Sequence, residues 1–568
     1  MGSRIKPSKV TREPSNRESV QSLLQSIKKY HKWFALVISF FLLLFAFSGI
    51  VLNHRIFFSR MDVSRKWLPA DYRYDNWNLG SVKSALRVSA DSVFIYGNIG
   101  IWLTSDRYDD FRDLSSGLPR GIDNRKIFTM LQTGNGHIYA GAQSGLYRLA
   151  RSAGTWKKIQ LPVSENRVVG MVQKGDSILV MTRSNLLIAS DTETPGFIKA
   201  DLPPALNTQN DVTLFRTLWL IHSGKIYGIA GKIVVDLMAA VLIFLIFSGL
   251  IHYFTPGLLK KTSVKQKRLK LKRTNKFFTK WHNTLGYLTA FFLVIIAFTG
   301  IFLRPPFLIP IAGVRVPVIK YSWLDNPNPW FDKLRDIIWD EESEIFIFST
   351  SEGIFYSESS LTGNLYPFHT APPVSVMGVN VFEKSGLGEY LVGSFSGIYR
   401  WTPGYFPERT IIKDHLTGHL AVKSERASPF GNFPVSGRIE LGEQEVLFDY
   451  LSGAVTIPQS RDYKALGTGL NPDGHDYPHQ GFVAMPAKII ENSPISLWNL
   501  ALEIHTGRIF SPLVGNFYIL YVPLTGISAL VVLITGFLIW WRKKGRKTNL
   551  APGRTTDRER PFPYNQER

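Results

Sequence analysis

The 568-residue chain contains no cysteine. This absence excludes disulfides, thiolate zinc sites, iron–sulfur clusters, thiol catalysis and the CxxCH attachment of c-type haem. The sequence also lacks a Walker loop, a Rossmann glycine fingerprint and a serine elbow in a suitable context. No low-complexity tract dominates, and aromatic residues reach 13%. Disordered, collagen-like and coiled-coil classes are therefore excluded as well.

Acidic residues are scarce, with 44 Asp and Glu against 66 Lys and Arg, and the formal net charge is +22. Three short segments account for the whole excess: residues 1–32 carry +6, residues 257–281 carry +10 and residues 542–568 carry +6. Basic segments beside membrane spans stay in the cytoplasm, where they meet anionic lipid. The charge therefore indicates membrane topology, and we predict no nucleic-acid partner.

Four apolar segments are long enough to cross a bilayer, which needs about 20 residues. They are Trp33–Leu52, Ile233–Tyr253, Leu285–Leu303 and Phe517–Trp541. The charge pattern places both termini in the cytoplasm and the two long connecting segments outside, in the periplasm of a Gram-negative cell. The lipid bilayer is thus a predicted partner, and a bacterial inner membrane is the expected location.

The predicted order alternates basic cytoplasmic segments, spans and external segments. It comprises a basic tail (1–32), span 1 (33–53), a β-rich segment (54–220), span 2 with its outer entry (221–254), a basic loop (255–281), span 3 (282–303), a second β-rich segment (304–504), span 4 with its outer entry (505–541) and a basic tail (542–568).

The chain is also a duplication. His31 precedes Ser48-Gly49 by the same distance at which His282 precedes Thr299-Gly300. A His-(Ser/Thr)-Gly-(Lys/Arg)-Ile segment recurs at His222 and His505. Both halves enter the membrane from the same side, so the spans are predicted to form two parallel repeats.

A weaker repeat runs through the external segments, about every 40–45 residues, as a strand, a turn of small residues and a second strand. Its units are Val93–Trp102, Ile138–Tyr147, Ile178–Leu187, Ile345–Phe355, Tyr390–Tyr399 and Val446–Val455. The predicted fold is therefore a four-helix membrane part plus one all-β external domain, propeller-like or a stacked β-meander, built from both long segments. Two separate small β domains are the alternative.

Six of the 12 histidines lie in or beside the spans. His31, His252 and His282 are expected at the inner face, and His54, His222 and His505 at the outer face. Histidine is rare near spanning helices unless it has a ligand or partner. Without cysteine or a dense carboxylate cluster there, the cofactor that fits two opposed imidazoles is b-type haem.

The repeat favours two haem ligand pairs, His31 with His282 and His222 with His505. His54 and His252 have no counterpart in the repeat and remain alternate ligands. Any one of these histidines alone could also be an ordinary polar residue at the membrane interface.

The segments Lys-Tyr-His31-Lys-Trp, Trp281-His282-Asn-Thr-Leu-Gly-Tyr and His505-Thr-Gly-Arg-Ile-Phe resemble the PepSY-associated transmembrane family. The resemblance covers the four spans and their flanks. It implies an iron-regulated inner-membrane protein or a dihaem ferric-siderophore reductase. The external segments depart from the family pattern toward blade-like repeats, which leaves the substrate open.

The leading hypothesis is a dihaem b-type cytochrome that passes electrons across the membrane to a periplasmic acceptor, such as a ferric chelate. The cytoplasmic segments are too short for a nucleotide-binding domain, so membrane quinol or a separate cytoplasmic reductase is the expected donor. The alternative hypothesis is a non-enzymatic, membrane-anchored β-rich sensor or assembly module, whose histidines only cap helices.

Overall fold

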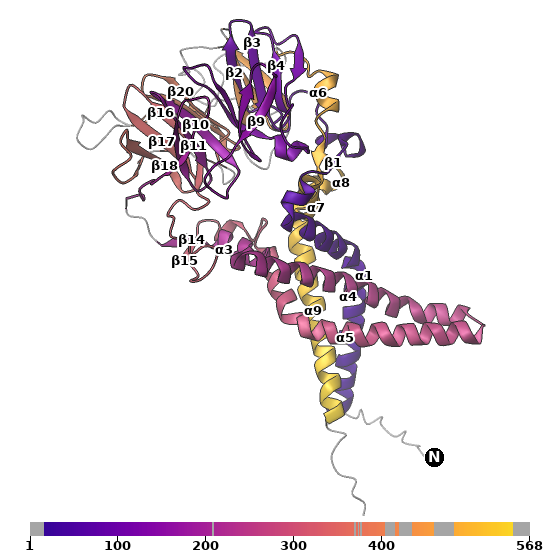
Figure 1. Cartoon of the computed structure of the whole chain (residues 1–568). Helices are drawn as coiled ribbons and strands as arrows, with labels where there is room; N and C mark the ends of the chain where they lie inside the picture. Colours follow the sequence, from indigo (N-terminus) through magenta and orange to yellow (C-terminus); the bar gives the residue numbers. More distant parts are fainter. Residues whose placement is uncertain are drawn as a thin grey trace, which may run out of the picture. The chain divides into compact units, whose positions relative to one another are not determined.

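The computed structural model describes residues 16–548, except for 207–209, 369–370, 373, 375–377, 404–414, 420–433, 443 and 459–481. The chain divides into two compact units, which are described separately (Figure 1). Met1–Asn53, Val212–Pro317 and Ile504–Arg568 make up the helical unit. His54–Asp211 and Val318–Glu503 make up the β unit.

Long apolar helices dominate the helical unit. Within the described residues, four stretches are long and apolar enough to cross a membrane: Gln25–Asn53, Lys225–Lys261, Lys265–Ile301 and Arg508–Arg542. The corresponding helices are α1 (Asn16–Asn53), α4 (Gly228–Lys261), α5 (Lys265–Ile301) and α9 (Tyr521–Thr548). Shorter helices are α2 (Arg55–Phe58), α3 (Leu214–His222), α6 (Ala487–Glu491), α7 (Leu497–His505) and α8 (Ser511–Val514).

The helices run further than the apolar segments alone. Most of the basic segment 255–281, expected as a loop, is helical, because α4 ends at Lys261 and α5 begins at Lys265. Lysine, arginine and leucine are good helix formers, so the helix continues after the apolar residues end. Hydropathy therefore identifies the residues that can lie in lipid, but it does not identify the residue at which the helix ends.

Each of the four long helices packs against two others. α1 contacts α9 and α4, and α5 contacts α4 and α9. The α1–α9 pair and the α4–α5 pair cross one another in Figure 1. Large apolar side chains remain on their outer faces, with Phe40 59%, Ile233 61% and Phe291 69% exposed. Exposed apolar surface along whole helices is stable in lipid and costly in water, so these faces support a membrane location.

Within the described residues, the β unit contains six antiparallel sheets of three or four strands in sequence order. Four sheets are β2 (Ser84–Ser89) to β5 (Phe111–Asp113), β6 (Ile127–Gln132) to β9 (Thr155–Ile159), β10 (Val168–Lys174) to β13 (Ile198–Ala200) and β16 (Leu334–Asp340) to β19 (Tyr366–Pro367). The other two are β20 (Val381–Gly386) to β23 (His415–His419) and β24 (Val435–Leu441) to β26 (Gly453–Pro458).

The inner strands of these sheets are β3 (Ser92–Gly97), β4 (Gly100–Thr104), β7 (Ile138–Ala142), β8 (Gly145–Ala150), β11 (Ser177–Thr182), β12 (Leu186–Ser190), β17 (Ile345–Thr350), β18 (Gly353–Glu358), β21 (Glu389–Ser394), β22 (Gly397–Thr402) and β25 (Gln444–Asp449). Two small sheets pair β1 (Asp62–Val63) with β27 (Ile495–Ser496) and β14 (Asp211–Thr213) with β15 (Arg315–Pro317).

A glycine follows the tight turn in five of the six repeat units found in the sequence. Each begins the second strand of a hairpin with a positive φ: Gly100 (86°), Gly145 (146°), Gly353 (132°), Gly397 (133°) and Gly453 (92°). Residues with a Cβ rarely adopt this conformation, so glycine is the residue that these turns require. The recurring Ser-Gly and Asn-Ile-Gly turns in the sequence therefore mark the hairpins.

The two sequence segments of the β unit form one domain, and two separate small domains are not formed. The first strands of the six sheets contact one another in a closed order: β2 with β6, β6 with β10, β10 with β16, β16 with β20, β20 with β24, and β24 with β2. Buried apolar side chains join the segments at both junctions, Val169 with Ile337 and Val82 with Ile439. The core thus extends across the chain break that the helical unit introduces.

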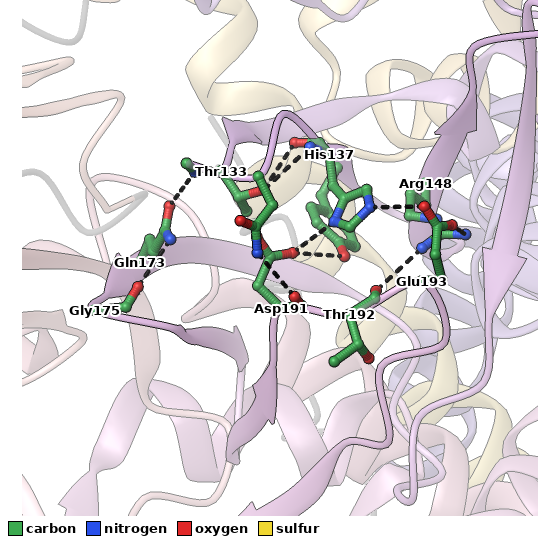
Figure 2. Close-up of polar contacts among 11 residues, drawn as sticks. Thr133, His137, Arg148, Gln173, Gly175, Asp191, Thr192 and Glu193 are labelled. Carbon is green, nitrogen blue, oxygen red and sulfur yellow. Dashed lines mark hydrogen bonds and ion pairs between the residues drawn. The ribbon is translucent and has the colours of Figure 1, made fainter.

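A polar cluster ties the second sheet to the third (Figure 2). His137 Nδ1 lies 2.8 Å from Asp191 Oδ1, and His137 Nε2 lies 3.2 Å from Glu193 Oε1. The hydrogen bond to Asp191 raises the pKa of His137. Burial opposes ionisation of Asp191, but hydrogen bonds from Thr133 and His137 outweigh it and lower the pKa of that carboxyl.

This cluster predicts a stability that depends on pH. The raised pKa of His137 contributes stability that is complete below 6.5 and is lost as the pH rises through that raised pKa. The lowered pKa of Asp191 contributes stability that is complete above 3.8. His137→Gln should therefore lower the free energy of unfolding by about 1 kcal/mol between these two values and by less at alkaline pH. Thermal unfolding of the full chain in detergent measures this difference. A penalty that grows toward alkaline pH would contradict the assignment.

Candidate functional site in the helical unit

Four of the six histidines singled out in the sequence lie in the helical unit with half-buried side chains. His31 is within α1, and His282 is within α5. His222 and His505 are the last residues of α3 and α7. Each of these four histidines lies at an end of an apolar stretch, next to a basic or polar segment.

All four imidazoles make the same contact with a neighbouring helix, at a Ser/Thr–Gly pair. These pairs are Ser48-Gly49, Ser248-Gly249, Thr299-Gly300 and Thr535-Gly536. In every case Nδ1 lies near the hydroxyl oxygen: His505 with Ser48 (2.9 Å), His282 with Ser248 (2.9 Å), His222 with Thr299 (3.4 Å) and His31 with Thr535 (3.2 Å).

The same ring nitrogen also meets a backbone carbonyl three residues before the hydroxyl residue. The acceptors are Val532 for His31 (3.0 Å), Ile296 for His222 (2.9 Å), Leu245 for His282 (3.1 Å) and Phe45 for His505. A carbonyl oxygen only accepts, so Nδ1 donates and carries the proton of the neutral imidazole. The lone pair is then on Nε2, which has no hydrogen bond to any residue in the described part of the chain.

The glycine of each pair leaves room for the ring. A Cβ built on Gly300 would lie 2.9 Å from His222 Cε1, and one on Gly536 would lie 3.0 Å from His31 Cε1. The contacts at Gly249 (3.5 Å, His282 Cε1) and Gly49 (3.7 Å, His505 Cε1) are of ordinary van der Waals length. Two glycines are therefore required by the histidine positions, and two are compatible with a methyl group.

The structure gives a ring-to-ring geometry for one of the two predicted pairs. The rings of His222 and His505 have centroids 6.1 Å apart, with planes inclined at 62°. His31 and His282 are within the range of an electrostatic interaction with one another. Two imidazoles whose free nitrogens each lie about 2 Å from one shared metal have centroids about 6 Å apart. The His222–His505 separation is compatible with this spacing, so these two residues would hold a haem iron, which would supply one-electron chemistry.

The two alternate histidines are placed differently. His252 is exposed, and its Nδ1 lies 3.1 Å from Thr279 Oγ1 and 3.2 Å from Asn275 Oδ1. His54 is exposed, belongs to the β unit and precedes α2, where its carbonyl accepts from Phe57 and Phe58. Neither occupies a Ser/Thr–Gly pair of the kind found for the other four.

The Ser/Thr–Gly pairs are visible in the sequence, but their contact with the histidines is not. The equal distances from His31 to Ser48 and from His282 to Thr299 indicate the duplication. In the structure, the glycine and hydroxyl of each pair receive the histidine of another helix. Which helices meet is a tertiary property that spacing within one helix cannot supply.

The similarity of the chain to solved structures is weak. The extracellular domain of a putative one component system from B. thetaiotaomicron is 13% identical, with a TM-score of 0.31, and the match covers 68% of this chain and 39% of that one. PorZ of the type-IX secretion system of Porphyromonas gingivalis is 10% identical, with a TM-score of 0.30 and the same coverages. The chain thus spans about two fifths of these two proteins. A search of curated proteins finds no match.

A family model matches far more of the chain. The model describes the PepSY-associated TM region and extends over residues 28–543, which include α4, α5, most of α1 and α9, the four histidines and the β unit. The match confirms the resemblance seen in the sequence. The chain belongs to the PepSY-associated transmembrane family.

Proposed function

We propose that this protein is an inner-membrane b-type dihaem cytochrome that passes electrons across the membrane to a periplasmic acceptor. The proposed acceptor is the iron of a ferric chelate. The observation that carries the proposal is the pairing of His222 with His505 at a centroid distance of 6.1 Å. Haem iron bound by two histidines supplies reversible one-electron transfer. The residues of the chain must orient the ligand nitrogens and place two haem sites across the membrane.

The first task is to fix the ligand nitrogens. Histidine ligands commonly donate their second ring nitrogen to a carbonyl or carboxylate, which sets the tautomer and the ring orientation. The Val532 carbonyl does this for His31, and the Ile296 carbonyl does it for His222. The Ser/Thr hydroxyls give a second contact, so each ring is held from another helix and its Nε2 is presented for ligation.

The second task is to provide two positions across the membrane. His31 and His282 would hold one haem, and His222 and His505 the other. A hydrocarbon core about 30 Å thick is too wide for one efficient transfer, and two haems divide it. One electron from quinol or a cytoplasmic reductase would convert one ferric ion of the chelate to ferrous iron, so donor and acceptor balance one for one.

The β unit is proposed to be a six-bladed propeller. The propeller proposal is supported by the contacts among the first strands of the six sheets, which run in sequence order from β2 to β24 and then close from β24 to β2. Antiparallel sheets of up to four strands arranged around an axis are the blades of such folds. In this proposal two insertions of the helical repeat together supply the blades.

The orientation in the membrane follows from charge. Residues 1–32, 257–281 and 542–568 are proposed to lie in the cytoplasm and the β unit in the periplasm. Alkaline phosphatase, which is active only outside the cytoplasm, should be inactive when fused after Arg268 and active when fused after Gly145. The reverse pattern would overturn this orientation.

Reduction of a ferric chelate tests the proposed function. The purified protein, reduced with dithionite and freed of excess reductant, should be reoxidised by a ferric chelate, with one ferrous ion trapped per electron lost. A protein that contains no haem, or one whose reduced form is not oxidised by any ferric chelate, would favour the sensor or assembly module.

A further inference from the structure

Five cationic side chains of the β unit interact electrostatically with Arg167 or Lys126 or belong to that pair. They are Arg55, Lys126, Arg167, Arg183 and Arg335, linked by mutual electrostatic interactions centred on Arg167 and Lys126. In the described part of the chain, Asp123 forms ion pairs with Arg55 and Lys126, and Asp332 forms one with Arg183. The five cations outnumber these two carboxylates.

The two carboxylates are already occupied. Asp123 accepts two hydrogen bonds from Arg55, at 3.0 and 3.1 Å, and its Oδ1 lies 3.0 Å from Lys126 Nζ. Asn499 Nδ2 also donates to it, at 3.2 Å. Asp332 Oδ1 lies 2.8 Å from Arg183 Nε. Neither carboxylate is paired with Arg167.

Arg167 is the exceptional member of the cluster. Its guanidinium carbon lies 4.2 Å from the ring centroid of Phe128, so one face of the planar group is covered. Its Nε is buried and has no hydrogen-bonding partner in the described part of the chain. Burial, followed by the charges of Arg183, Arg55 and Arg335, lowers the pKa of Arg167 to about 9. The group still carries its charge at neutral pH, in surroundings that disfavour it.

A buried charge surrounded by like charges is unfavourable unless an opposite charge compensates it. A guanidinium stacked on an aromatic ring keeps its edge donors for a planar pair of oxygens. We infer that Arg167 and its neighbours form a binding site for an anionic, carboxylate-bearing small molecule.

The inference deepens the proposed function, on which it rests for the identity of the ligand. The ferric acceptor would be a negatively charged chelate with carboxylate oxygens, and a neutral hydroxamate chelate would not use this site.

Calorimetric titration of the full-length protein in detergent tests this inference. The ligands are ferric citrate, citrate alone and a neutral ferric trihydroxamate chelate. The variant is Arg167→Gln, and the matched control is Arg151→Gln, at an exposed arginine of the same unit. Arg167→Gln should weaken binding of ferric citrate at least tenfold, and Arg151→Gln should not change it. Citrate alone should compete for the site.

Equal affinity of the wild type and Arg167→Gln for ferric citrate, or no binding by the wild type, would overturn the inference. Binding of the neutral chelate with the same dependence on Arg167 would overturn the anionic class. If Arg167→Gln does not fold, wild-type binding should still weaken steeply between about 50 and 500 mM salt, and binding insensitive to salt would contradict the site. The titration needs no haem, and haem content measured on the same samples shows separately whether the proposed function fails.

Discussion

His222→Ala and His505→Ala are each expected to remove one haem from every chain and to leave the other haem bound. His31→Ala and His282→Ala should do the same for the second haem. In the proposed scheme, removing one imidazole would leave the iron with a single protein ligand, while the other two histidines would still hold the second haem. The haem content per chain, measured as the pyridine haemochrome, should therefore fall from about two to about one.

The alternate histidines provide the controls. His252→Ala and His54→Ala should keep both haems, because these side chains are exposed and lie outside the Ser/Thr–Gly contacts. Full haem content in all four paired-histidine variants would discard the ligand scheme. Loss only in His54→Ala or His252→Ala would retain a cytochrome with different ligands.

Gly300→Ala should be nearly as damaging to haem binding as removal of its histidine. The added methyl would lie 2.9 Å from His222 Cε1 and 3.2 Å from its Nδ1, so the ring must move away from the Ile296 carbonyl. Overpacking of this kind typically costs about 1–3 kcal/mol, and here the cost falls on the position of a ligand nitrogen. Optical titration should show that the haem associated with His222 and His505 is lost or weakly held.

The other glycines of the pairs form a graded control series. Gly536→Ala should disturb His31 in the same way, at 3.0 Å, whereas Gly49→Ala, at 3.7 Å from His505 Cε1, should retain its haem. Gly257→Ala, in α4, is a control for replacing a helical glycine with alanine, because nothing lies within 4 Å of the added methyl. Equal haem loss across the series would show that the close approaches do not position the histidines.

Much of the helical unit could be predicted from the sequence because its signals are local. A run of apolar residues of sufficient length identifies each span without reference to any partner, and α1, α4, α5 and α9 all contain the predicted segments or most of them. The helical conformation of most of the basic segment 255–281 could not be predicted in the same way. Its many lysines are compatible with both a solvated loop and a solvated helix, and charge alone does not distinguish them.

The β unit was predictable for a different reason. Glycines at positions such as Gly145 and Gly353 must follow the turn with positive φ, so they mark the hairpins in the sequence. The order in which the sheets meet could not be deduced, because contacts such as Val169 with Ile337 join residues far apart in the chain. The cluster around Arg167 could not be deduced for the same reason, because its members come from elements far apart in the sequence.

For the candidate site, residue type and repeat spacing were sufficient to single out the histidines. The ligand scheme itself stays a prediction. What the sequence could not show is that Ser248 and Thr535 lie beside His282 and His31, because those contacts join different helices. The resulting hydrogen bonds fix the ring nitrogen that remains available, and this detail makes the proposal specific enough to test.

The most direct test of the central claim is the reduced-minus-oxidised optical spectrum of the purified wild-type protein, recorded together with the amount of haem per chain. Bis-histidine b-type haem predicts a Soret band that sharpens and shifts on reduction, distinct α and β bands, and about two haems per chain. A preparation that is folded, contains no haem after expression with adequate iron and haem precursor, and does not take up added haem would contradict the account.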